Sequence, residues 1–180
     1  MHLRSLSLET LSHIFTDEEP KDGEQYIQIL GREKNQRAYK FIRREYINNV
    51  VNLDKWKLFI SKANGMGTFG ATLSDPILAG PGIGSTETFL SLGAFDSKES
   101  AMNAEKYIRS KFARAMLGVL KATQDVTPSK WKYVPLQDFS SSSDIDWTQS
   151  VHDIDQQLYK KYELTDEEQA FIESHVKEMD

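Results

Sequence analysis

The sequence of 180 residues contains no cysteine, which excludes disulfide bonds, a thiolate zinc site and a cysteine nucleophile. Long apolar runs are also missing. The longest, AMLGVL at 115–120, is far shorter than the ~20 residues that span a bilayer. The first fifteen residues lack the apolar core of a signal peptide. We therefore expect a cytoplasmic protein that makes no membrane contact.

An excess of positive charge is missing as well. The chain has 22 basic and 27 acidic side chains, a formal net charge of −5, and an acidic total usually argues against nucleic-acid binding. Its hydrophobic content of 39% and aromatic content of 11% are typical of a folded globular chain. The length predicts one domain, or one domain with an appendage.

The charges are unevenly distributed along the chain. Residues 136–180 contain 12 acidic and three basic side chains, whereas residues 32–62 contain nine basic and three acidic ones. The near-neutral total therefore combines a basic segment with an acidic tail, and it does not exclude binding to a polyanion.

Hydrophobic periodicity predicts strands first and helices later. The expected strands alternate apolar and polar residues at 25–30, 37–43, 55–61 and 85–95, and a last extended segment is expected at 131–139. A long helix is expected from Asp96, where Asp96 and Glu99 have capping-box spacing, until shortly before Pro128. Two short helices are expected after Ser150 and after Thr165.

These elements predict the α+β class, with a mostly antiparallel twisted sheet, one long central helix and a small C-terminal helical subdomain. We expect residues 1–139 to form the α+β domain and residues 140–180 to form an acidic helical appendage docked on it. Short apolar-striped helices are not stable alone. Four apolar side chains of the appendage are expected to pack on the domain, with the acidic side chains facing water or a basic patch: Trp147, Ile154, Leu158 and Phe171.

Several motifs carry little weight. The stretch 65–70 matches the letters G-x-G-x-x-G, but it does not open a helix as a dinucleotide site requires, so we interpret it as a flexible loop or a close backbone approach. The four histidines lack metal-ligand spacing, and the acidic clusters lack the central glycine of a calcium loop. We therefore predict no metal site and no catalytic residue in this chain.

The basic strand region is the most informative part. Arg32, Lys34 and Arg37 flank an expected hairpin turn that contains Asn35 and Gln36. Arginine and lysine neutralise phosphates, and arginine, asparagine and glutamine bind base edges. The alternative is a solvated strand face. The same two interpretations apply to the other polar residues of the strand, glycine-rich loop and helix: Lys57, Lys62, Asn64, Thr68, Lys111 and Arg114.

Six segments then occur in a characteristic order, T-E-T-x-L, Y-I-x-x-K-F-x-R, V-P-x-Q-D-F, D-I-D-W, I-D-x-Q-L-Y-x-K-Y and L-x-x-E-E. They occupy 86–90, 107–114, 134–139, 144–147, 154–162 and 164–168. Between about Lys55 and Glu173, the chain resembles the C-terminal target-recognition region of bacterial type II restriction–modification proteins that carry an adenine-specific DNA methyltransferase domain.

The resemblance implies a module that recognises a sequence in double-stranded DNA and performs no chemistry of its own. The catalytic N-P-P-[YF] tetrapeptide and the glycine-rich strand-turn that binds S-adenosylmethionine are absent here. S-adenosylmethionine is therefore expected in a partner methyltransferase domain, in cis or in trans, with or without an endonuclease domain. The alternative is a protein-interaction or assembly domain of the same system that makes no base contacts.

Overall fold

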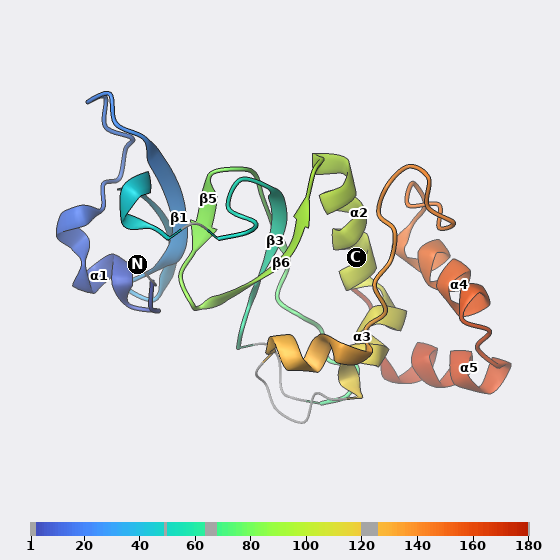
Figure 1. Ribbon diagram of the computed structural model, residues 1–180. Helices are drawn as coiled ribbons and strands as arrows, with labels where there is room; N and C mark the ends of the chain where they lie inside the picture. The colour runs from blue at the N-terminus through green and yellow to red at the C-terminus, as the bar shows by residue number, and fades with distance from the viewer. Residues whose placement is uncertain (1–2, 49, 64–67, 120–125, 180) are drawn as a thin grey trace. The chain divides into compact units, whose positions relative to one another are not determined.

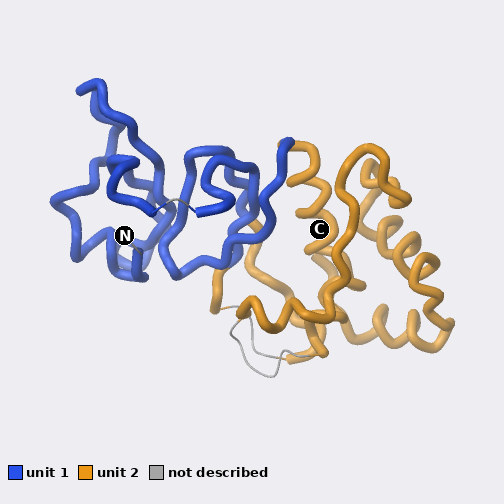
Figure 2. The backbone as a smooth tube through the Cα atoms, in the orientation of Figure 1, with its two compact units in different colours: residues 1–60, 77–97 blue, residues 61–76, 98–180 orange. Residues whose placement is uncertain are grey.

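The computed structural model describes residues 3–48, 50–63, 68–119 and 126–179 (Figure 1). The chain forms two compact units (Figure 2). Unit 1 comprises residues 1–60 and 77–97, and unit 2 comprises residues 61–76 and 98–180. In the described structure, the strands lie mainly in unit 1 together with one short helix, and the longer helices lie in unit 2, which confirms the α+β class. Among the residues that the structure describes, no helix is long and apolar enough to cross a membrane.

Unit 1 is built around two small sheets of three strands each. The first has the order β2-β1-β5 and consists of β1 (Tyr26–Glu33), β2 (Gln36–Arg43) and β5 (Ile83–Ser85). The second has the order β4-β3-β6 and consists of β3 (Trp56–Ser61), β4 (Ile77–Ala79) and β6 (Phe89–Phe95). Strand β1 pairs antiparallel with β2 and parallel with β5, and β3 pairs antiparallel with β4. The expected antiparallel pairing is present, but in two sheets.

Strand β1 is buried on both faces because two clusters of apolar side chains pack against it. Ile27 and Ile29 on one face join a cluster with Leu8 from α1 (Ser7–Thr10). Leu30 on the other face packs with Phe59 of β3, and with Ala79 and Phe89. Burying side chains of this size stabilises the fold by roughly 1.5–3 kcal/mol each. The remaining short elements of unit 1 are the 3-10 turns η1 (Ser12–Ile14) and η2 (Arg44–Tyr46).

The described residues of unit 2 form four helices and a 3-10 helix, and the expected long central helix is divided in two. Its elements are α2 (Lys98–Arg109), α3 (Lys111–Gly118), η3 (Pro128–Tyr133), α4 (Val151–Lys161) and α5 (Asp166–His175). Ser110 separates α2 from α3 because its backbone is extended, with ψ 147°, and its Oγ accepts a hydrogen bond from the amide of Ala113. The periodic pattern alone did not distinguish this serine cap from a helix interior.

The C-terminal helices pack on α2 and α3 within unit 2, so the structure groups the central helices with the tail instead of dividing the chain at residue 139. Trp147, Ile154 and Leu158 are buried in one cluster with Tyr107 and Phe112, as expected. Phe171 differs, since its side chain is 49% exposed. An extended segment is expected at 131–139, but residues 131–133 belong to η3. The capping box expected after Thr165 is present, because Thr165 and Glu168 bond each other's backbone amides.

Candidate nucleic-acid interface

The β1–β2 hairpin ends in a two-residue loop formed by Lys34 and Asn35. Both residues have positive φ values, 47° and 61°, as a type I′ turn requires. The flanking residues Glu33 and Gln36 are cross-strand partners, so the loop is as short as a hairpin allows. The amide of Lys34 donates a hydrogen bond of 2.7 Å to Glu9 Oε1. The expected hairpin turn is therefore confirmed. Its two loop residues are Lys34 and Asn35, one position before the expected Asn35 and Gln36.

Two arginines and a tyrosine share one face near the end of this hairpin. Arg32 and Arg37 are direct cross-strand partners, so their side chains emerge on the same face. Tyr39 lies two residues beyond Arg37 and therefore points to that face as well. Arg37 is exposed, and the Tyr39 side chain is 41% exposed. We did not single out Tyr39 from the sequence, although the alternation of the strand placed it beside Arg37.

The Arg32 guanidinium is held by the turn. Its Nη1 donates a hydrogen bond of 2.8 Å to Asn35 Oδ1. Its Nε is buried and has no hydrogen-bond partner within the described part of the chain. Arg32, Lys34 and Arg37 likewise form no ion pair with any residue that the structure describes. The hairpin end thus carries three basic side chains that form no ion pair within the described residues, while the Glu9 carboxylate lies at the backbone amide of Lys34.

The other exposed basic residues of this segment are paired. Lys40 lies 2.5 Å from Asp17 and 3.2 Å from Glu33, and the hydrogen bond to Asp17 raises the pKa of Lys40. Arg43 pairs with Asp22 at 3.4 Å. Further pairs join Arg44 to Asp54 and Lys55 to Asp96. Five described basic residues between 32 and 62 form no ion pair with another described residue: three lie at the hairpin end, and the others are Lys57 and Lys62.

Lys57 does not lie on the surface, in contrast to the expectation from strand alternation. Lys57 is 1% exposed. Its Nζ donates hydrogen bonds of 2.8–2.9 Å to the carbonyl oxygens of Leu53, Lys55 and Gly80. Burial lowers the pKa of Lys57 to about 8. From Lys57 to Ser61, the residues on both faces of β3 are buried. The prediction that Lys57 contacts a phosphate is therefore wrong, because its side chain is buried.

The two helical candidates are also engaged within the fold. Lys111 Nζ lies 2.6 Å from a carboxylate oxygen of Glu173, so the acidic tail already neutralises it. Arg114 is 3% exposed, its Nε donates to the carbonyl oxygen of Arg109, and burial lowers its pKa to about 10. Neither side chain is presented to a phosphate. The prediction of phosphate contacts at Lys111 and Arg114 is therefore wrong, and both side chains take part in the packing of unit 2.

Two of the three predicted contacts in and beside the glycine-rich loop lie within the described residues. Asn64 lies outside the described residues, Thr68 is exposed, and Lys62 is half-buried. Gly70 has a φ of 69°, and a Cβ there would lie 2.2 Å from the carbonyl oxygen of His175. The interpretation of this stretch as a close backbone approach is therefore confirmed at Gly70.

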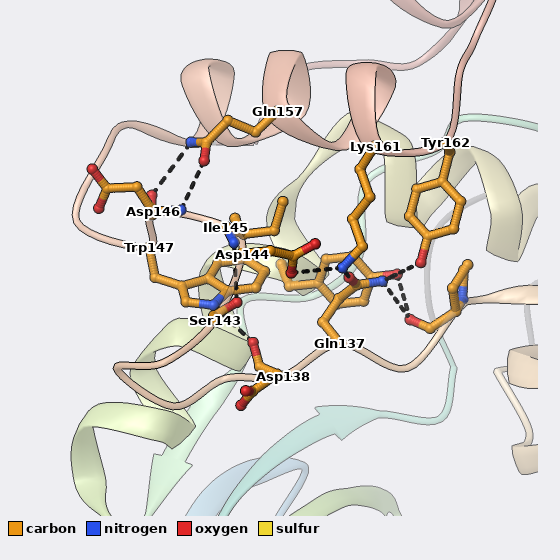
Figure 3. A network of polar contacts seen from close by, with 12 residues as sticks. Gln137, Asp138, Ser143, Asp144, Ile145, Asp146, Trp147, Gln157, Lys161 and Tyr162 are labelled. Carbon is orange, nitrogen blue, oxygen red and sulfur yellow. Dashed lines mark hydrogen bonds and ion pairs between the residues drawn. The ribbon is translucent and has the colours of Figure 1, made fainter.

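The acidic D-I-D-W motif forms a structured loop within unit 2 (Figure 3). Asp144 pairs with Lys161 at 2.8 Å, and Lys161 also donates to Gln137 Oε1 at 2.9 Å. The indole N–H of Trp147 donates to the carbonyl oxygen of Asp138 at 2.9 Å. The motif thus anchors the tail through ordinary hydrogen bonds and one ion pair, as a docking element does.

No cluster of three or more potential metal ligands occurs in the part of the chain that the structure describes. No family model, no curated protein and no solved structure matches the chain. The residues that the structure brings together are those of the hairpin end, Arg32, Lys34, Asn35, Gln36, Arg37 and Tyr39, while Lys62 and Thr68 stay predicted contacts outside it.

Proposed function

We propose that this chain is a DNA sequence-recognition module that contacts duplex DNA through the end of the β1–β2 hairpin. The observation that carries the proposal is the pair of opposed arginines, Arg32 and Arg37, which no carboxylate neutralises in the described structure. A two-stranded β-ribbon fits the major groove of B-DNA, so a hairpin end can present side chains to base edges.

The side chains at the hairpin end divide the task. Lys34 at the turn provides a mobile positive charge for a phosphate. Arg37 provides a second positive charge for a phosphate, and Asn35 and Gln36 are the residue types that bind adenine edges through paired hydrogen bonds. Arg32 is already oriented by Asn35, which lowers the entropy that a guanidinium loses on binding.

The partner in this proposal is an adenine-specific methyltransferase domain, which supplies the S-adenosylmethionine and the chemistry. The support for it is the order of motifs from the T-E-T-x-L strand to the L-x-x-E-E helix, which resembles the target-recognition region of restriction–modification proteins. The chain itself would only recognise the target. We further propose the cytoplasm as its place of action.

The test is the salt dependence of DNA binding by the full chain and two matched variants. Arg37→Gln removes an unpaired charge of β2, whereas Arg43→Gln removes a charge of the same strand that is paired with Asp22. For Arg37→Gln, we expect the slope of log K against log salt concentration to fall in magnitude by about 1 for the lost phosphate contact. For Arg43→Gln, we expect the slope of the parent chain.

Three results would contradict the proposal. One is an absence of salt-dependent binding to a pool of duplex sequences by the full chain. Another is an equal change of slope for the Arg37 and Arg43 variants, which would place the contact elsewhere. The third concerns the non-catalytic role: methyl transfer to DNA by this chain with S-adenosylmethionine would show that it carries chemistry after all.

A further inference from the structure

Unit 2 carries an apolar groove of about 490 Å³ that no element of the described structure fills. Its two main walls are α3 and α5, and Phe69 and Tyr162 contribute further lining. All of its lining residues belong to unit 2, whereas the β1–β2 hairpin belongs to unit 1. Binding of a ligand in this groove is therefore a function separate from DNA recognition and does not depend on it.

Each wall presents an apolar helical stripe. In α3 the stripe has the spacing i, i+3, i+4 and i+7 and consists of Phe112, Ala115, Met116 and the C-cap residue Val119. In α5 the groove is lined by Phe171 and Ile172 one turn after Glu168. Phe112, Ala115 and Ile172 are buried in the core of unit 2, so Val119 and Phe171 form the exposed apolar part of the two walls. An exposed apolar strip between two helices is a surface on which a further helix can pack.

The walls of the groove present large apolar side chains to solvent. Val119 is 60% exposed and Phe171 is 49% exposed, although both are large and apolar. The Phe171 ring is nevertheless held in place, since its centroid lies 5.6 Å from that of Phe69 and 4.1 Å from that of His175. A preformed aromatic anchor on an open apolar surface is typical of protein–protein interfaces.

Negative charge beside the groove favours a partner with positive charge. The first turn of α5 carries Asp166, Glu167 and Glu168, and all three are exposed. Glu168 is occupied by the capping box, but Glu167 lines the groove and forms no ion pair within the described residues. None of the described lining residues is basic. A basic partner would be attracted, and an acidic one would be repelled.

We propose that this groove binds an amphipathic helix of a partner protein, with apolar side chains at i, i+3 or i+4, and i+7, and with lysine or arginine beside that stripe. The binding mode is an apolar helix face laid into a hydrophobic groove. The apolar stripe of the partner would cover Val119 and Phe171, and its basic side chains would face Glu167.

The probe for the test is a fluorescently labelled 18-residue peptide with leucine at the stripe positions and lysine beside them. Its control is the same peptide with glutamate in place of each lysine. Binding to the full chain is followed by fluorescence anisotropy. We expect the basic peptide to bind more tightly than the acidic one, and Glu167→Gln to reduce this difference.

Two variants locate the site, and a third serves as a matched control. We expect Phe171→Ala and Val119→Ser each to weaken binding of the basic peptide about tenfold or more, as the loss of an interface anchor does. Leu136→Ala removes a leucine that is 91% exposed but does not line the groove, so it should bind like the parent chain. Circular dichroism verifies the fold of each variant. Equal binding by all variants, or equal binding of both peptides, would overturn the proposal.

Discussion

Arg32 and Arg37 lie directly opposite each other across the β1–β2 hairpin, two residues from its turn. Like charges at directly opposed positions of an antiparallel pair are destabilising, by an amount on the scale of roughly 0.2–1 kcal/mol. In the described structure no carboxylate offsets this repulsion. A bound phosphate would do so, and for that reason stability and the proposed function make opposite demands on these two positions.

We therefore expect Arg37→Gln to stabilise the free protein. Removal of one charge relieves the repulsion at Arg32, so the free energy of unfolding should rise by a few tenths up to about 1 kcal/mol in the absence of DNA. Urea denaturation at low salt measures this change, and the gain should shrink in high salt because the repulsion is screened. A clear loss of stability would show that the Arg37 side chain supports the fold.

Lys57 should make the stability of the protein increase at alkaline pH. Burial lowers its pKa to about 8 in the folded chain, below about 10.4 in the unfolded chain. Its destabilising effect is complete below about pH 8 and disappears as the pH rises toward about 10.4, because the neutral amine is tolerated in the interior.

Lys57→Met provides the comparison for that effect. The parent chain should gain stability relative to this variant between pH 8 and pH 10, as measured by urea denaturation at each pH. The variant should be less stable overall because the carbonyl oxygens of Leu53, Lys55 and Gly80 lose their donor. If the stability difference between the two proteins does not change with pH, the lysine is not desolvated as the structure indicates.

Asp155 should have the opposite dependence on pH. Its carboxylate accepts hydrogen bonds from the amides of Lys111 and Phe112 at the start of α3, yet burial raises its pKa to about 6. The folded chain therefore holds the proton more tightly than the unfolded one. This group contributes a loss of stability as the pH rises from about 4 to about 6, on the order of 2–3 kcal/mol.

The matched variant is Asp155→Asn, which keeps the shape and one acceptor oxygen but does not titrate. The stability of the parent chain relative to this variant should fall between pH 4 and pH 7. Parallel stability curves for the two proteins would contradict the assignment. Asp166→Asn, at an exposed position, is the control for a simple change of net charge.

Gly70→Ala should destabilise the protein more than a positive φ alone explains. A Cβ at this position would lie 2.2 Å from the carbonyl oxygen of His175, and the φ of 69° adds backbone strain. Gly23 has a φ of 87° but open space around its Cβ position, so Gly23→Ala measures the strain by itself. We expect the fall in melting temperature to be clearly larger for Gly70→Ala. Equal falls in melting temperature would show that the backbone at His175 lies farther from Gly70 than the structure indicates.

Local patterns predicted much of the secondary structure. The strands at 26–33, 36–43 and 56–61, and the capped helix after Thr165, lie where alternation and capping signals placed them. The hairpin end was predictable for the same reason, since the turn and the flanking arginines are close in sequence. Interactions within a few residues are encoded directly by side-chain type and spacing.

Burial was less predictable, because it depends on which distant segments cover a residue. Lys57 has a surface-like position in its strand pattern, but both faces of β3 are buried in the folded chain. Phe171 belongs to an apolar stripe, but the stripe remains half open. The division of the central helix at Ser110 also depends on a distant group, because Asp155 holds the first amides of α3.

By itself, the sequence determined the α+β class, the hairpin with its basic end, and the separation of a basic segment from an acidic tail. Only the tertiary structure decided which charges remain unpaired. Ion pairs and burial neutralise or hide Lys40, Lys57, Lys111 and Arg114, while Arg32 and Arg37 keep their charge unopposed. Electrostatic interactions act through space, so a count of charges along the chain cannot show which of them are paired or buried.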